Sequence, residues 1–175
     1  MSVGILIGTN RENAVSETIA KIYAEILSTK GIEAEIIYLK SLPEDFAFSA
    51  LYKHNGKNEG FNAVKSRVQA HSKLFVIVPE YNGSFAGVLK TFIDGMPYPK
   101  GFEDKKIALV GVSSGIQGGA LALSHLNDIF SYLNAQVLAQ KVKLMQIEKN
   151  LVDGKIINPL FVQLIEIQIN KFLDF

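Results

Sequence analysis

The sequence of 175 residues contains neither cysteine nor tryptophan. Without cysteine, the chain cannot form disulfide bonds, supply a thiolate nucleophile or build a cysteine-based metal site. It has no large excess of either charge, since 18 Lys and Arg stand against 17 Asp and Glu. This balance argues against nucleic acid or an anionic membrane as a partner. The sequence also lacks an apolar run long enough to span a membrane, so we expect a cytoplasmic protein.

The sequence does contain enough apolar material for a core. Hydrophobic residues make up 48% of the chain and charged residues 20%, which is an ordinary balance for a globular protein. A chain of this length can bury a sizeable core as one unit. No internal repeat, low-complexity tract or linker divides it. We therefore expect residues 1–175 to form a single domain.

Strand and helix patterns alternate along the chain. Apolar or alternating segments predict five strands, at 3–7, 32–39, 74–78, 107–112 and 136–138, the last of them the weakest. Apolar residues at helical spacing predict five helices, around 19–27, 61–68, 88–93, 122–133 and 159–172. This alternation is typical of an α/β three-layer sandwich, in which helices cover both faces of a parallel sheet. Right-handed crossovers favour the five-stranded order 2-1-3-4-5.

Two connections fall outside this alternation. Residues 41–58 form a long connection that carries Phe46, Phe48 and Tyr52, and connections of this length are often functional. Residues 139–157 contain Asp153-Gly154 between apolar pairs, which predicts a small hairpin.

The loop after the first strand, residues 8–16, combines groups that bind anions. Thr9 and Ser16 carry hydroxyls, Arg11 carries a guanidinium, and a helix begins directly afterwards. The N–H groups at the start of a helix add to such a site. The loop therefore favours a phosphate cradle, although a capped helix start with a solvent-exposed arginine would give the same pattern.

Two further loops follow strands whose carboxyl ends should lie at the same edge of the sheet. The loop after the third strand offers an amide, a hydroxyl, an aromatic ring and free backbone N–H groups, which suit a flat heterocycle: Pro79, Glu80, Tyr81, Asn82, Gly83 and Ser84. The loop after the fourth strand exposes its backbone to a ligand: Ser113, Ser114, Gly115, Gly118 and Gly119. We expect a side chain at Gly118 to occupy space that a ligand needs. A merely flexible turn is the alternative for this last loop, because it matches neither common glycine-rich nucleotide motif.

With these loops in order, the chain resembles the NAD(P)H-dependent FMN reductase family of flavodoxin-like proteins, which includes azoreductases, quinone reductases and chromate reductases. Gly8-Thr9-x-Arg11 with Ser16 is similar to the family's G-S-x-R phosphate loop. The segment 79–84 is close to its P-E-Y-N loop, and 113–119 matches its glycine-rich loop. The resemblance implies a flavodoxin-like fold.

The resemblance also implies FMN as a cofactor and NADPH or NADH as the hydride donor. It places the FMN phosphate on Thr9, Arg11 and Ser16, and the flavin ring between residues 79–84 and 113–119. Because hydride transfer takes place within the cofactors, no catalytic residue is assigned. The implied partners are a small-molecule electron acceptor, such as a quinone, azo compound, free flavin or metal oxyanion, and further copies of the chain in a dimer or tetramer.

The chain departs from the family pattern at several positions. Thr9 replaces a serine but keeps the hydroxyl, Gly95-Met96 stands where a bulky residue is usual, and residues 43–60 diverge. The preference for an acceptor and for NADPH or NADH therefore does not carry over. The aromatic residues of 41–58 either cover the flavin of a partner subunit or fold back on their own sheet. Phe85, Tyr98 and the closing helix are candidates for subunit contacts.

A non-catalytic electron carrier of the flavodoxin type is the main alternative. Such carriers are commonly strongly acidic and use a T-x-T-G-x-T loop, whereas this chain is nearly neutral and has Arg11. A receiver-like signalling module would need an acidic residue where Gly8-Thr9 stand. A nucleotide-binding module without flavin also suits the phosphate loop. The three histidines are too widely separated to indicate a metal site: His54, His71 and His125.

Overall fold

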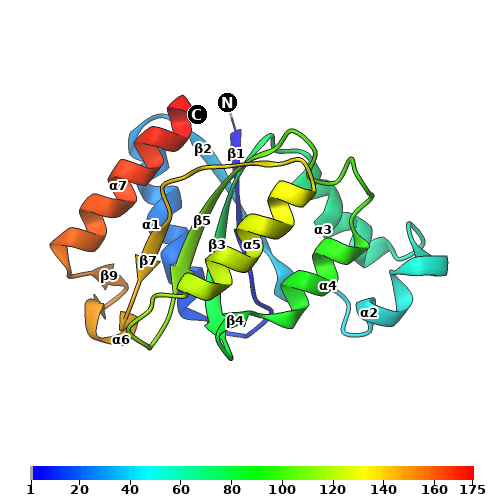
Figure 1. The fold of residues 1–175 in the computed structure, drawn as a ribbon, viewed down its shortest axis with the longest axis horizontal. Coiled ribbons are helices and arrows are strands. Elements are labelled where there is room, and N and C mark those ends of the chain that lie inside the picture. Colours follow the sequence, from blue (N-terminus) through cyan, green and yellow to red (C-terminus); the bar gives the residue numbers. More distant parts are fainter. Residues whose placement is uncertain (1) are drawn as a thin grey trace.

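The structure is a computed structural model that describes residues 2–175, and a parallel sheet forms its middle layer (Figure 1). The strands are β1 (Ser2–Ile7), β2 (Glu33–Tyr38), β3 (Lys73–Tyr81), β4 (Ser84–Phe85), β5 (Lys106–Val112), β6 (Gln136–Val137), β7 (Val142–Leu144), β8 (Leu151–Val152) and β9 (Lys155–Ile156). The parallel strands follow the order β2-β1-β3-β5-β6, and β4 is a short antiparallel addition to β3. The predicted α/β sandwich with strand order 2-1-3-4-5 is therefore confirmed.

Helices cover both faces of this sheet (Figure 1). They are α1 (Val15–Thr29), α2 (Phe46–Ser49), α3 (Glu59–Gln69), α4 (Gly87–Gly95), α5 (Ala120–Tyr132), α6 (Ile147–Asn150) and α7 (Pro159–Asp174), with 3-10 turns η1 (Leu39–Ser41) and η2 (Tyr52–His54). The five predicted helices correspond to α1, α3, α4, α5 and α7, and α2 and α6 are short additions. None of the helices in residues 2–175 is both long and apolar enough to cross a membrane.

Two apolar layers hold the helices against the sheet. On one face α1 and α7 pack so that Phe75 of β3 contacts Tyr23 and Phe172, at ring-centroid distances of 5.1 and 4.5 Å. On the other face α3, α4 and α5 form the second layer, in which Phe61 contacts Phe92 at 5.5 Å. Strand residues alternate between the two layers, as their two-residue period requires. Both faces are thus covered, and the loops at the carboxyl ends of the strands are left along one edge.

The last position of the sheet differs from the prediction. The pattern predicts one strand at 136–138. In the structure, two short strands take this position: β6 pairs with β5, the chain then leaves the sheet, and β7 pairs with β5 further along. The buried side chain of Gln168 in α7 fills the gap, because its amide N–H groups donate to Leu109 O (3.0 Å) and Gln140 O (2.8 Å). A side chain thus takes hydrogen bonds that a continuous strand would have made.

The two irregular connections also have defined structures. In the segment 41–58, Phe46 is buried and stacks on Phe61 at 6.0 Å, whereas Phe48 and Tyr52 are 84% and 87% exposed. Phe46 therefore folds back into the core of its own chain, against α3, and the other two aromatic side chains lie on the surface. In the segment 139–157 the predicted hairpin is confirmed, because β8 and β9 pair antiparallel around Asp153-Gly154.

Candidate functional site

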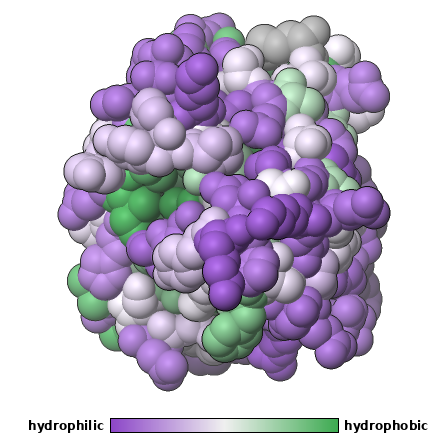
Figure 2. Space-filling view, turned by 90° about the vertical axis from the view of Figure 1, so that its right-hand side faces the viewer, coloured by the Kyte–Doolittle hydropathy of each residue, from purple (hydrophilic) through white to green (hydrophobic). Residues whose placement is uncertain are grey.

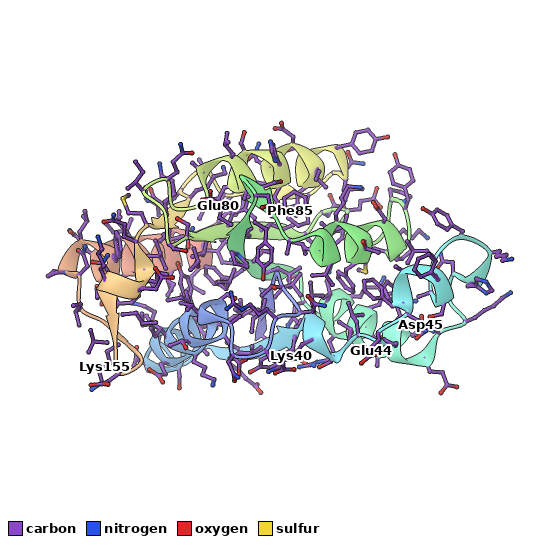
Figure 3. All side chains as sticks on the ribbon, turned by 90° about the horizontal axis from the view of Figure 1, so that it is seen from below. Lys40, Glu44, Asp45, Glu80, Phe85 and Lys155 are labelled. Atoms are coloured by element: carbon purple, nitrogen blue, oxygen red, sulfur yellow. The ribbon has the colours of Figure 1, made fainter. Side chains whose placement is uncertain are left out.

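The three loops that the sequence singles out meet at the carboxyl edge of the sheet, which Figure 3 shows from below. They enclose a hollow of about 110 Å³. Its lining comes from all three loops and from α6: Thr9, Arg11, Ala14, Val15, Ser16, Pro79, Glu80, Tyr81, Val112, Ser113, Ser114, Ile147 and Glu148. The structure thus brings together most of the residues predicted for the site. Asn82, Gly83, Ser84, Gly115, Gly118 and Gly119 lie outside this hollow, on the adjoining parts of the same loops.

The start of α1 forms one wall of the hollow. Ala14 at the N-cap provides no side-chain hydrogen bond, so the first N–H groups of the helix are not capped by a side chain. Ser16 is buried, and its Oγ has no hydrogen-bond partner among the described residues. A buried hydroxyl without a partner costs about 1–3 kcal/mol. Together with the exposed Arg11, these unsatisfied donors suit an anion such as a phosphate.

Thr9 joins the first loop to the second. Its hydroxyl is almost completely buried, lies 3.1 Å from the Tyr81 hydroxyl and accepts a hydrogen bond from Arg11 N (3.2 Å). The Thr9 side chain therefore fixes the backbone at Arg11 and the ring of Tyr81 at the same time. Thr9 is thus held in place by neighbours that line the same hollow.

Acidic side chains near the first loop are neutralised by Lys40. Its Nζ lies 3.2 Å from Glu12 Oε2 and 3.1 Å from Glu17 Oε2. The hydrogen bond from Lys40 lowers the pKa of Glu17 below its usual value. Because both carboxylates have a cationic partner, they oppose the approach of an anion to the α1 start less than unpaired carboxylates would.

The second loop is a tight hairpin, which corrects the expectation that the third strand stops at the proline. β3 continues to Tyr81, with Pro79 still in register with Val112 of β5. Asn82 and Gly83, with positive φ angles of 49° and 73°, then reverse the chain into β4. The strand runs past the proline because β4 gives it a partner.

Glu80 links the second loop to the third. Its Oε2 accepts a hydrogen bond from Gly119 N at 3.0 Å, and Gly119 is the N-cap of α5. The carboxylate thus faces the positive end of a helix, where a negative charge is favourable. The sequence predicts Glu80 as a cofactor-binding residue, and the structure places its side chain on the backbone that begins α5. Figure 3 shows Glu80 near the middle of the edge.

Position 118 requires a glycine for a different physical reason from the one expected. Its φ is +60°, and an added Cβ would lie 2.7 Å from Cβ of Lys143. The glycine is required by the protein's own packing, so a side chain there would first displace the loop rather than a ligand. Gly115 differs, because an added Cβ would find no heavy atom nearer than Ser113 Oγ at 3.9 Å. A ligand can therefore approach the backbone at Gly115.

The contribution of α6 to the hollow is not predicted from the sequence. Ile147 N donates to Ser113 O (3.0 Å) and Gln146 N donates to Gly115 O (2.9 Å), so the turn before α6 anchors the third loop. Ile147 and Glu148 line the hollow. No motif marks this contact, because it depends on the return of the chain through β7.

His71, one of the three histidines, lies at the opposite edge of the sheet, with its Nε2 2.6 Å from Glu35 Oε2.

Comparisons with known sequences show the family of the chain. The model of the family described as NADPH-dependent FMN reductase matches residues 1–148. The chain is 26% identical to a 2-hydroxy-1,4-benzoquinone reductase of a Burkholderia species over 157 residues, which cover 88% of this chain and 83% of that protein. It is 32% identical to the FMN-dependent NADPH-azoreductase of Staphylococcus aureus over 129 residues, which cover 71% of this chain and 66% of that protein.

A solved structure supports the same fold. The flavoenzyme NAD(P)H:(acceptor) oxidoreductase FerB of Paracoccus denitrificans is similar with a TM-score of 0.80 and 21% sequence identity, covering 99% of this chain and 95% of that chain. At this identity the likeness concerns the fold alone. The sequence match, however, extends over all three loops that form the hollow. The chain therefore belongs to the NADPH-dependent FMN reductase family, as the sequence analysis predicts.

Proposed function

We propose that this protein is an FMN-dependent NAD(P)H oxidoreductase that passes reducing equivalents from a nicotinamide donor, through the flavin, to a small-molecule acceptor. The observation that carries the proposal is the hollow at the start of α1. There the helix start without a side-chain cap, the Arg11 guanidinium and the unpartnered Ser16 hydroxyl converge. A phosphate monoester carries a charge of about −1.5 to −2 at neutral pH and satisfies all three groups.

The size of the hollow supports different places for the two ends of FMN. A hollow of about 110 Å³ is smaller than the roughly 300–1,000 Å³ of pockets that enclose a drug-sized ligand, so it would accommodate the phosphate group rather than the whole cofactor. Thr9, Arg11 and Ser16 would hold the phosphate inside. The ring would lie outside, between residues 79–84 and 113–119.

The protein's own groups would bind and orient the ring. Asn82, Ser114 and Gly115 are exposed at the two loops that would flank it. Backbone N–H groups near the pyrimidine edge of a flavin stabilise negative charge on its reduced form. When bound, FMN supplies the redox chemistry by accepting two electrons from the nicotinamide and passing them to the acceptor. No side chain is assigned as a general acid or base.

The acceptor class follows from the relatives and is the less specific part of the proposal. Curated relatives carry the names of a benzoquinone reductase and an azoreductase. We therefore propose a quinone, an azo compound, a free flavin or a metal oxyanion as acceptor.

The experiment that tests the proposal separates an enzyme from a carrier. The purified protein is loaded with FMN, its visible spectrum is recorded, and oxidation of NADPH and NADH is followed with a benzoquinone and an azo dye. Bound flavin with steady turnover supports the reductase. Bound flavin without turnover indicates an electron carrier, and absence of flavin binding after incubation with excess FMN refutes the proposed cofactor.

A homo-oligomer is also part of the proposal. An apolar hollow of about 430 Å³ lies between the end of α4 and α5. Figure 2 shows such a hydrophobic hollow, framed by hydrophilic residues, on the side of the molecule that carries α4. Its rim includes Tyr98 and Tyr132, which are 69% and 74% exposed and stack at 6.3 Å. Lys90, Asp94 and Asp128 add charges of both signs, so the surface can complement a second copy of itself.

A further inference from the structure

A second polar groove lies beside the third loop, on the far side from the phosphate hollow. It has a volume of about 550 Å³ and runs between α5 and the chain that leads into β7, two segments that lie side by side in Figure 1. One wall is a single face of α5: Ala120, Leu123, Ser124 and Asn127. The other wall is Ala139, Gln140, Lys141 and Lys143. It shares no residue with the phosphate hollow.

The two lysines of this groove have no acidic partner. Every ion pair within residues 2–175 involves other cationic side chains. Lys141 is half-buried, and its Nζ donates only a long hydrogen bond of 3.5 Å to Leu138 O. Burial lowers the pKa of Lys141, which reflects a cation that has lost water without gaining a counter-ion. An anionic ligand would remove this cost.

The other polar groups of the groove point to the same ligand chemistry. Ser124 contributes a hydroxyl, Asn127 and Gln140 contribute amides, and no carboxylate lines the groove. Hydroxyl, amide and ammonium donors together suit the oxygens of a phosphate. The N–H groups at the start of α5 are not what would bind the anion, because the Glu80 carboxylate already accepts a hydrogen bond from Gly119 N there.

We propose that this groove binds a phosphate group of the nicotinamide dinucleotide donor. The inference rests on the proposed function and adds the place where the donor is held. Ala120 directly follows Gly119, and the backbone of Lys143 lies against Gly118. A donor whose nicotinamide reaches the flavin beside this loop can therefore extend its phosphates past the loop into the groove.

The test replaces the half-buried cation without changing the size of the side chain greatly. Binding of 2′,5′-ADP, ADP and 5′-AMP to the FMN-loaded protein is measured by calorimetry for the wild type, Lys141→Gln and Lys155→Gln. Lys155→Gln is the matched control, because Lys155 is an exposed lysine in β9 and does not line the groove. We expect Lys141→Gln to weaken binding about tenfold, the scale of one charge-assisted hydrogen bond. The affected probe is 2′,5′-ADP if the groove holds the 2′-phosphate, and ADP if it holds the pyrophosphate. The control should bind as the wild type does.

Kinetics then distinguish the two sources of the phosphate. If the groove holds the 2′-phosphate, Lys141→Gln raises KM for NADPH about tenfold and leaves KM for NADH unchanged. If it holds the pyrophosphate, both KM values rise by a similar factor. In each case kcat and the affinity for FMN stay at the wild-type values, because the variant touches neither the phosphate hollow nor the ring loops.

Two results would overturn the inference. One is a wild-type protein that binds FMN and oxidises NADPH, with a Lys141→Gln variant whose probe affinities and KM values are unchanged. The other is a wild type that binds none of the three probes while holding FMN. Failure of the proposed function is seen separately, as loss of flavin binding or turnover in the wild type, and the calorimetric comparison requires no turnover.

Discussion

At the scale of single residues, Ser16 is the clearest sign that the structure is prepared for a ligand. Its hydroxyl is buried beside the α1 start and has no hydrogen-bond partner in the described part of the chain. Arg11 stands at the same hollow without an acidic side chain paired to it among residues 2–175. A fold selected for stability alone has no use for these two features, whereas an anion would use both.

Ser16→Ala should raise the stability of the flavin-free protein and lower its affinity for FMN. Without FMN, the variant loses an unsatisfied buried oxygen, so its free energy of unfolding should rise by about 1 kcal/mol. Its affinity for FMN should fall about tenfold, because one donor to the phosphate is lost. Chemical denaturation of the flavin-free protein and fluorescence titration with FMN measure the two effects. Ser66→Ala, an exposed serine of α3, serves as the control and should leave FMN affinity unchanged. A destabilised Ser16→Ala protein with normal affinity would show that the hydroxyl serves the fold instead.

At the scale of elements, the Glu80–Gly119 hydrogen bond connects the β3–β4 hairpin to the start of α5. Glu80→Ala should cost about 0.5–2 kcal/mol of stability, the range for loss of a helix cap. The amide of Gly119 should exchange hydrogen faster, because its acceptor is gone. FMN affinity should fall in the same variant, since the two loops that we propose to flank the ring lose their connection.

Glu80→Gln is the matched comparison for this pair. Its side-chain oxygen can still accept the hydrogen bond from Gly119, so it should retain most of the amide protection and of the FMN affinity. If Glu80→Ala and Glu80→Gln lose affinity equally while Gly119 exchange stays slow, the charge of Glu80 acts on the ligand directly and its link to α5 is not what matters.

The start of α1 also carries a pH-dependent contribution to stability. The hydrogen bond from Lys40 lowers the pKa of Glu17 below 4.5 in the folded protein, so the pair stabilises the fold above pH 4.5. This contribution is lost as the pH falls through the lower folded value. Glu17→Gln should therefore be less stable than the wild type at pH 7, and the difference between the two should shrink as the pH falls below 4.5. Denaturation series from pH 3 to 7 measure this difference, with Glu25→Gln, an exposed site in the same helix, as control. A stability difference that is the same at every pH would exclude the ion pair as its cause.

Local patterns predict the elements of this fold better than the contacts between them. The strands β1, β3 and β5 are continuous apolar runs, and α7 has its Asn158 cap and Pro159 in the sequence itself. The interrupted last strand depends instead on Gln168, whose amide reaches a carbonyl 59 residues away. The link from Glu80 to Gly119 spans 39 residues in the same way. Hydrogen bonds between residues so far apart in the sequence follow from the packed structure, and the spacing of residues within a short segment does not predict them.

At the scale of the whole molecule, three hollows lie at different places around the sheet. The hollow at the α1 start lies at the carboxyl edge. The polar groove that contains Lys141 runs beside α5 and β7, and the apolar hollow lies between α4 and α5. α5 borders the last two of these regions with different faces. Its N-terminal end also adjoins the third loop, through Gly119. A change in α5 should therefore affect both the proposed donor groove and the proposed subunit contact through one element.

The apolar hollow gives the last prediction. An exposed hollow of this kind is costly in water, and stable subunit interfaces cover about 800 Å² on each partner. Tyr132→Glu places a charge at its rim and should shift the protein to monomers in analytical ultracentrifugation, because a buried unpaired charge opposes association. Since Tyr132 is 74% exposed, the fold of each monomer should be unaffected, and its circular dichroism should match that of the wild type. Val152→Glu changes an exposed apolar residue of β8, 47% exposed and outside this hollow, and should remain oligomeric. A wild type that sediments as a monomer at all concentrations, or a Val152→Glu variant that dissociates while Tyr132→Glu does not, would rule out this surface as the contact.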